Sequence, residues 1–324
     1  MKKFAKTVVG TALGVGAGLF AAGAIAYEAV LNMKLHDFVM KTGFFNNPEE
    51  DKFWAENELY HNGFKWYKEI KPELVSVDSR LAREAFADII PAKEETHKWA
   101  VVIHGYSGTP AVMAHYAWKY SKAGYNVILP HMVGHDNDTT VHNEYYCSMG
   151  YYDKEFILDW INWIVAKDPE AEIIMHGVSM GSATTMMVTG EDIPDNVIAA
   201  IADCGFTSCW DEFASQFKEM FNIPSFPLLN IANVYSKLRG NFDFKECSPL
   251  NAVARSKTPT MFVHGEDDTF VPYRFMQPLY DACTAEKEML SVPGSFHANA
   301  VFVDNERYWN TVFEFIAKHT KIAE

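Results

Sequence analysis

The stretch Gly177-Val178-Ser179-Met180-Gly181 contains the residue types that most clearly suggest chemistry. It follows an apolar run at residues 173–175 and precedes small residues at 182–185, an order that predicts a strand, a sharp turn and a helix. In such a turn the serine hydroxyl projects from the edge of a sheet, and the two glycines avoid side-chain collisions. The alternative is a glycine-rich loop that merely opens a helix, and the short motif alone does not exclude it.

A serine hydroxyl is a poor nucleophile at neutral pH, so it needs a base, and the base needs a carboxylate that orients it. Two stretches that each follow an expected strand supply these groups. The first, residues 264–272, contains Asp268, and the second, residues 294–298, contains His297. The chain order Ser179, Asp268, His297 is the order of α/β-hydrolases and differs from that of chymotrypsin or subtilisin.

The elements that must position these residues are buried strands alternating with helices. Continuous apolar runs predict strands at 99–104, 126–129, 172–176, 197–202, 260–264 and 288–292, after an opening hairpin at 74–77 and 85–90. Helix-length segments lie at 111–123, 153–166, 182–189, 274–283 and 305–318. This alternation predicts an α/β class with a doubly wound, mostly parallel sheet.

One long interval interrupts the alternation between Asp203 and Thr260. Its aromatic residues recur at helical spacing, which predicts a helix with one apolar face, and a second helix is expected near 229–238. A connection of this length inside a compact domain is usually functional, so we expect a helical cap over the site at about 207–255. The alternative is a helical insertion that packs on the sheet edge.

The N-terminal region divides into two parts ahead of the main domain at 71–324. Lysines at positions 2, 3 and 6 precede an uncharged run at 7–27, long enough to cross a bilayer as a helix. Residues 1–30 are therefore expected to be a membrane anchor that leaves the rest outside the cytoplasm. The alternative is a signal peptide cleaved near Ala26, with secretion of the remainder. Residues 31–70 are rich in aromatic residues and predict a helical extension.

Charge and composition exclude several function classes. The net charge is −14 and the pI about 5.3, so the surface repels phosphate backbones and we expect no nucleic-acid partner. The five cysteines have no zinc-ribbon spacing and are expected to be unpaired, buried thiols. Five histidines lie between His104 and His142, near Asp136 and Asp138, but no metal-binding pattern is formed. We expect neither a metal nor a cofactor.

Residues from about 70 to 320 resemble the α/β-hydrolases of the serine esterase and serine aminopeptidase-like superfamily. More narrowly, they resemble membrane-anchored or secreted hydrolases of Gram-positive bacteria. The segments that carry this resemblance are 104–108, which matches the oxyanion loop, 150–153 with 159–160, 203–208, and the acid loop 265–272. The sequence departs from this family at Gly134-His135-Asp136-Asn137-Asp138, where Gly-His-Gly-x-Ser is common.

The resemblance also assigns roles within the site. Its acid-loop pattern Gly-x-x-Asp-x-x-Val-Pro selects Asp268 over the adjacent Asp267. Asp203 is a second candidate for the acid that orients the histidine. The alternative is that Asp203 is a structural carboxylate. The oxyanion of a tetrahedral intermediate needs two backbone N–H groups. Met180, as the residue after the nucleophile, supplies one, and the resemblance implies that Tyr106 supplies the other.

These residues together predict a serine hydrolase, specifically a carboxylesterase that works through an acyl-enzyme intermediate. One alternative is a peptidase of the aminopeptidase type on short peptides, which needs an amine site such as Asp211, Glu212 or Glu219 in the cap. Another is a membrane-associated lipase or acyltransferase. A non-catalytic receptor that retains the fold is a rival from a different class, and the complete set of three residues disfavours it.

Overall fold

The computed structural model describes residues 18, 20–41, 47–135, 146–219 and 222–321. Within these ranges the strands form one eight-stranded sheet in the order β1-β2-β4-β3-β5-β6-β7-β8. Their bounds are β1 Glu73–Ser79, β2 Arg83–Ile90, β3 Lys98–Ile103, β4 Asn126–Pro130, β5 Glu172–Val178, β6 Val197–Asp203, β7 Thr260–Gly265 and β8 Lys287–Val292. The β1–β2 and β2–β4 pairs are antiparallel and the other neighbours are parallel. The mostly parallel sheet that the apolar runs predict is confirmed.

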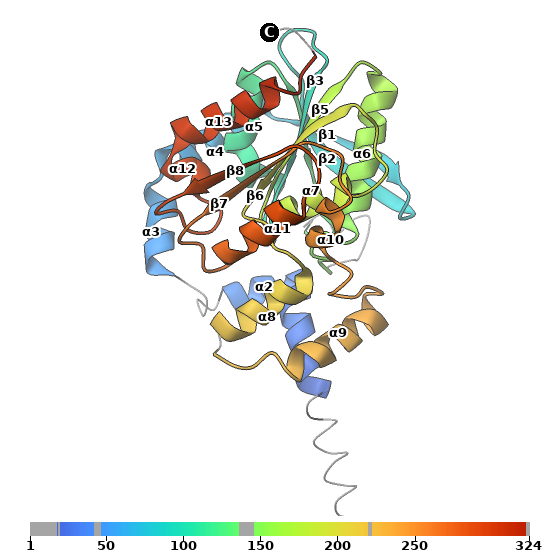
Figure 1. Ribbon diagram of the computed structural model, residues 1–324, viewed down its shortest axis with the longest axis vertical. Coiled ribbons are helices and arrows are strands. Elements are labelled where there is room, and N and C mark those ends of the chain that lie inside the picture. The colour runs from blue at the N-terminus through green and yellow to red at the C-terminus, as the bar shows by residue number, and fades with distance from the viewer. Residues whose placement is uncertain (1–17, 19, 42–46, 136–145, 220–221, 322–324) are drawn as a thin grey trace, which may run out of the picture.

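Helices cover both faces of the sheet (Figure 1), which explains why the central strands are apolar throughout. Every residue of β5 and β7 is buried. One face packs against α4 Glu58–Ile70, α5 Ala114–Lys122 and α13 Asn305–Ala317. The other face packs against α6 Asp153–Lys167 and α7 Met180–Thr189. The remaining elements here are α3 Pro48–Glu56, α11 Met276–Ala282, α12 Ala300–Val303 and the 3₁₀ turns Pro110–Met113 and Tyr273–Phe275.

The interval between β6 and β7 forms α8 Cys209–Glu219, α9 Leu228–Arg239 and α10 Pro249–Val253. In Figure 1, α8 and α9 lie together at the bottom of the molecule, beyond the sheet, with α2 Met33–Met40 beside them. The short helix α10 instead returns to the sheet and packs against α7. We refer to α8, α9 and the segment that joins them as the cap.

The N-terminal helical residues 20–31 pack against the cap. A Cβ atom built on Gly23 would lie 2.4 Å from Ile231 Cγ2, and the Tyr27 ring meets the Tyr235 ring edge-on at 5.1 Å between centroids. No helix in the described part of the chain is long and apolar enough to span a membrane. Most of the expected membrane segment 7–27 lies outside the described residues, and the described part contacts α9.

Candidate active site

Ser179 occupies the sharp turn between β5 and α7 that the motif predicts. Its backbone has φ 59° and ψ −120°, a strained conformation that directs the side chain out of the sheet edge. The flanking glycines are required by close backbone contacts. A Cβ on Gly177 would lie 2.1 Å from the Gly181 carbonyl oxygen, and one on Gly181 would lie 2.1 Å from the Ile103 carbonyl oxygen.

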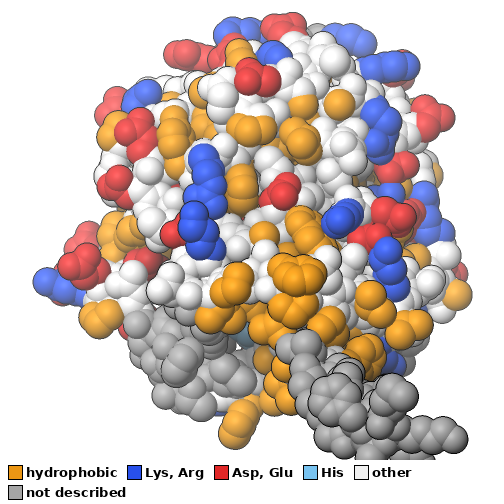
Figure 2. Space-filling model, turned by 60° about the horizontal axis from the view of Figure 1, so that its bottom comes forward, with side chains coloured by type: hydrophobic (Ala, Val, Ile, Leu, Met, Phe, Trp, Pro, Cys, Tyr) orange, Lys and Arg blue, Asp and Glu red, His pale blue; other side chains and the backbone are white. Residues whose placement is uncertain are grey.

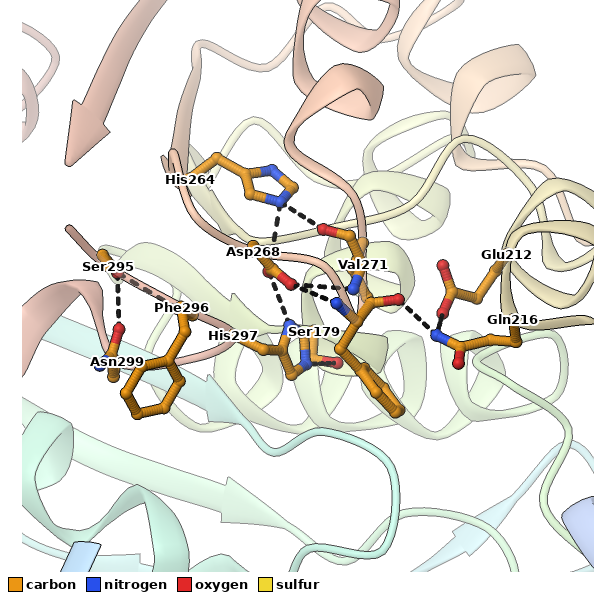
Figure 3. Close-up of polar contacts among 11 residues, drawn as sticks. Ser179, Glu212, Gln216, His264, Asp268, Val271, Ser295, Phe296, His297 and Asn299 are labelled. Carbon is orange, nitrogen blue, oxygen red and sulfur yellow. Dashed lines mark hydrogen bonds and ion pairs between the residues drawn. The ribbon is translucent and has the colours of Figure 1, made fainter. Parts of the chain in front are cut away.

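Ser179, His297 and Asp268 form one hydrogen-bonded series (Figure 3). The Ser179 hydroxyl lies 2.9 Å from His297 Nε2, and His297 Nδ1 lies 2.8 Å from Asp268 Oδ2. Asp268 follows β7 and His297 follows β8, so parallel strands that end at the same edge of the sheet bring the three side chains together. The sequence motifs predicted this juxtaposition, and the geometry agrees with it.

Asp268 is buried, with 4% of its surface exposed, and its two oxygens have separate sets of partners. Oδ1 accepts hydrogen bonds from the backbone N–H groups of Phe270 and Val271 at 3.0 and 2.9 Å. Oδ2 accepts from His297 and lies 3.4 Å from His264 Nε2. Burial alone would raise the pKa of this carboxyl, but the two histidines outweigh burial and lower the pKa to about 2. The group is therefore a carboxylate at neutral pH.

His297 is set up to exchange protons with Ser179. Burial by itself would lower its pKa, but the Asp268 carboxylate outweighs burial and raises the pKa well above 6.5. The carboxylate also fixes the proton on Nδ1, which leaves Nε2 free to accept the serine proton. The Phe270 ring packs on the imidazole at 4.9 Å between centroids and limits its movement.

The two rival carboxylates have different surroundings. Asp267 is exposed, and its backbone N–H bonds to the Ser295 carbonyl oxygen. Asp203 is fully buried, and its Oδ2 accepts a hydrogen bond of 2.7 Å from the Tyr308 hydroxyl. Burial raises the pKa of Asp203 to about 6. Of the three carboxylates, Asp268 is the one with a hydrogen bond to His297.

The two residues expected to supply the oxyanion N–H groups lie on segments next to the candidate nucleophile. Met180 is the first residue of α7, so its N–H has no acceptor within the helix and lies at the positive end of the helix dipole. The loop that carries Tyr106 passes directly over Ser179, because a Cβ on Gly105 would lie 3.1 Å from the Ser179 Cβ. Both expected oxyanion residues are therefore adjacent to the serine.

His104 holds the loop that carries Tyr106. Its Nε2 accepts the Met132 backbone N–H at 3.3 Å, so Nδ1 carries the proton and donates to the Gly105 carbonyl oxygen at 2.8 Å. Burial lowers the pKa of His104 to about 3, which keeps the ring neutral. The Tyr106 ring meets the His36 ring edge-on at 4.8 Å between centroids, and its hydroxyl donates to the Val30 carbonyl oxygen.

The structure adds a link between cap and site that the sequence did not reveal. Gln216 on α8 donates through Nε2 to the Phe270 carbonyl oxygen and to Glu212 Oε1, the latter at 2.8 Å (Figure 3). Phe270 in turn contacts both Asp268 and His297. In the sequence, Glu212 and Gln216 are four residues apart, which places them on one face of a helix. This spacing does not indicate which segment packs against that face.

The three cap carboxylates that a peptidase would use for an amine are largely occupied. Asp211 Oδ2 accepts hydrogen bonds from Thr207 and Ser208 at the start of α8. Glu219 lies 3.6 Å from Arg274. Glu212 is buried, and burial raises its pKa to about 8, so it is largely protonated at neutral pH. An open anionic site for a substrate ammonium is not formed by these three residues.

Possible metal ligands gather at one place in the described ranges. Cys204, Asp268 and His297 each offer an atom within 4.8 Å of the others, and two of them already belong to the hydrogen-bonded series. Asp136, Asp138 and His142 lie outside the described residues. All five cysteines are described, and each is buried and unpaired, as expected.

Comparisons with known proteins agree with this fold. A family model for the alpha/beta hydrolase fold matches residues 99–228. A Bacillus subtilis protein named "Uncharacterized protein YqkD" is 26% identical over 270 residues, covering 83% of this chain and 87% of its own length. A thermostable monoacylglycerol lipase from Bacillus sp. (strain H-257) is 26% identical over 246 residues, covering 68% of this chain and 90% of the lipase. The structure of the Pyrococcus furiosus esterase Pf2001 superposes with a TM-score of 0.59 at 19% identity, covering 78% of this chain and 95% of the esterase chain.

Proposed function

We propose that this chain is a serine hydrolase of the α/β-hydrolase superfamily and that it cleaves carboxylic esters through an acyl-enzyme intermediate. The observation that carries the proposal is the unbroken series from Ser179 Oγ through His297 to Asp268. A buried, charged acid, an oriented base and a serine at the sheet edge form the arrangement that activates a hydroxyl for acyl transfer.

The first half-reaction makes the acyl-enzyme. Ser179 Oγ attacks the ester carbonyl carbon while His297 Nε2 takes the hydroxyl proton, and Asp268 stabilises the resulting imidazolium. The carbonyl oxygen becomes an oxyanion that the N–H groups of Met180 and Tyr106 stabilise. The C–O bond to the alcohol then breaks, and His297 gives its proton to the departing alkoxide oxygen.

The second half-reaction regenerates the serine. Water attacks the acyl carbon and gives a proton to His297 Nε2, and the same two N–H groups stabilise the second oxyanion. The bond between the acyl carbon and Ser179 Oγ breaks, the carboxylic acid leaves, and the proton returns to Oγ. The proposed mechanism uses this chain's own residues and water throughout.

Two observations support an ester rather than a peptide substrate. The cap carboxylates Asp211 and Glu219 are paired with neighbours, and Glu212 is buried and largely protonated, so a free amine has no ready partner among them. In addition, the Bacillus relative named above is a monoacylglycerol lipase, whereas the solved structures that superpose with a TM-score of 0.59 include both an esterase and an acylaminoacyl peptidase and do not favour either substrate class.

A substrate panel tests this proposal. We expect wild-type protein to hydrolyse p-nitrophenyl esters of short and medium acyl chains and to leave aminoacyl p-nitroanilides intact, with no ester hydrolysis by the Ser179→Ala variant. Preference for the anilides would replace the esterase assignment with a peptidase. Preference for long acyl chains would favour a lipase. Equal ester hydrolysis by wild type and the variant would refute the proposed nucleophile.

We also propose that the N-terminal region holds the protein at a membrane, with the hydrolase domain outside the cytoplasm. The lysines before the uncharged run at 7–27 support this orientation. Fractionation of cells, combined with N-terminal sequencing of the mature protein, tests it. An intact N-terminus in the membrane fraction is expected. A mature chain that begins near residue 27 in the medium would show secretion instead.

A further inference from the structure

The cap exposes large apolar side chains on its outer surface. Phe226, just before α9, is 72% exposed, and Leu238, near the end of α9, is 76% exposed. Val234 lies one turn before Leu238 and is also exposed, as are Phe20 and Ile25 on the N-terminal helical residues. In Figure 2, which views the molecule from this end, hydrophobic side chains gather in the lower part of the picture. We call Phe20, Ile25, Ile223, Phe226, Val234 and Leu238 the cap surface.

These apolar side chains lie on two segments that run side by side. Gly23 packs against Ile231 of α9, and the Phe20 ring meets the Tyr235 ring at 6.1 Å between centroids. The cap surface is therefore built jointly by residues 20–31 and α9. Isolated exposed apolar residues are normal on a soluble protein, whereas a joint surface of several large side chains marks an interaction site.

The stretches 1–27 and 220–242, which contain all six side chains of the cap surface, lack acidic residues in a chain that is otherwise strongly acidic; Glu28, which follows the first stretch, bonds to Tyr146 and Tyr235. Residues 1–27 and 220–242 contain no Asp or Glu, although the chain carries 42 acidic residues among 324. At that average frequency these two stretches would carry about six. The stretches that form the cap surface therefore carry no negative side chain that an anionic lipid headgroup would repel.

The position of the remaining N-terminal sequence indicates what the cap surface meets. Residues 1–17 carry three lysines followed by an uncharged sequence, and the chain continues from them to Phe20 at the cap surface. An apolar segment needs about 20 residues to cross a bilayer, so the run 7–27 includes residues that contact α9. If the membrane segment proposed above is granted, lipid that surrounds this run also reaches the outer side of α9, because Gly23 of the run packs against Ile231.

We propose that the cap surface docks on a lipid bilayer, with Phe226, Val234 and Leu238 inserted at the headgroup boundary beside the N-terminal segment. The Tyr106 hydroxyl bonds to the Val30 carbonyl oxygen, so the segment that leaves the cap surface also touches the loop over Ser179. Docking places the active site next to the bilayer. If the proposed ester hydrolysis is granted, the favoured substrates are esters carried by membrane lipids.

A fluorescent probe on the full-length protein tests this docking without relying on activity. The native cysteines are all buried, so Leu238→Cys can be labelled selectively with an environment-sensitive nitrobenzoxadiazole probe. Leu74→Cys on the edge strand β1 is the matched control, because Leu74 is also an exposed leucine. Both variants are added to phosphatidylcholine–phosphatidylglycerol vesicles, and thermal unfolding verifies that each is folded.

We expect a blue shift, a several-fold rise in emission and quenching by brominated lipids at position 238, with little change at 74. An unchanged probe at 238 in the presence of vesicles overturns the proposal, whether or not the protein floats with them. A concentration-dependent change at 238 without vesicles also overturns it, because a second copy of the chain would then cover the cap surface. None of these outcomes depends on whether Ser179 is a nucleophile.

Discussion

Asp268 is the residue whose charge most affects the proposed chemistry. Its carboxylate raises the pKa of His297, and His297 accepts the serine proton only when it is neutral. The value of kcat/KM for an ester should therefore rise with pH through an apparent pKa above 6.5. Asp268→Asn removes the charge and the correct tautomer, so we expect a loss of about 10⁴-fold and a shift of that apparent pKa to lower pH.

The adjacent Asp267 offers a matched control for this prediction. It is exposed, and its side chain has no role in the hydrogen-bonded series. Asp267→Asn should keep both the rate and the pH profile of the wild type. A large loss in Asp267→Asn, or an unchanged pH profile in Asp268→Asn, would show that the acid is assigned wrongly.

Burial of Glu212 makes the stability of the folded protein depend on pH. Burial raises its pKa from 4.5 to about 8, so the folded protein holds this proton more tightly than the unfolded chain does. This group therefore lowers the free energy of unfolding as pH rises from about 4.5 to 8. Glu212→Gln removes the titration, and its stability relative to wild type should grow over that range, by up to a few kcal/mol.

Urea unfolding of both proteins at several pH values between 4 and 9 measures the difference. A difference that does not change with pH would mean that Glu212 titrates normally in the folded state.

The hydrogen-bonded series of Ser179, His297 and Asp268 was predictable because its motifs combine residue type with position after a strand. Gln216 and Phe270 were not predictable, because their roles depend on how the cap packs against the acid loop.

The contact between α8 and the loop after β7 leads to a prediction at the scale of elements. Gln216 donates to the Phe270 carbonyl oxygen, and Phe270 borders both Asp268 and His297. Gln216→Ala should free this loop, lower kcat several-fold with little change in KM, and reduce the free energy of unfolding by about 1 kcal/mol.

The matched control is Gln277→Ala on α11, where the amide bonds to Asp281 on the exposed side of the helix. Its kinetic constants should equal those of the wild type. Equal kcat values for Gln216→Ala and Gln277→Ala would indicate that the cap does not position the acid loop.

The strands and helices of the main domain were predictable from the pattern of apolar residues along the sequence. Continuous apolar runs predict two-sided burial, and β3, β5 and β7 are buried in this way. The packing of residues 20–31 on α9 was not predictable, because a mostly apolar helix suits a bilayer and a protein surface equally well. The long interval after β6 predicted an inserted helical unit but gave no information on which helix would face the N-terminal region.

In the whole molecule, the N-terminal helical residues pack against the cap at Tyr235 and at Ile231. Gly23 meets Ile231 so closely that any side chain would force the two helices apart. Gly23→Leu should lower the free energy of unfolding by about 1–3 kcal/mol and expose residues 20–31 to protease in detergent micelles. Gly18→Leu is the matched control, because no atom lies within 4 Å of a Cβ built there, and it should resemble the wild type. Equal protease sensitivity of the two variants would show that this contact contributes little.

Three segments far apart in the sequence meet at one sheet edge around Ser179, the proposed nucleophile. The most direct test is reaction of the full-length protein with a fluorophosphonate, followed by mass-spectrometric mapping of the modified peptide. We predict one adduct on Ser179, its loss in Ser179→Ala, and strongly reduced labelling in His297→Ala. An unlabelled wild type, or an adduct on a different residue, would contradict the account.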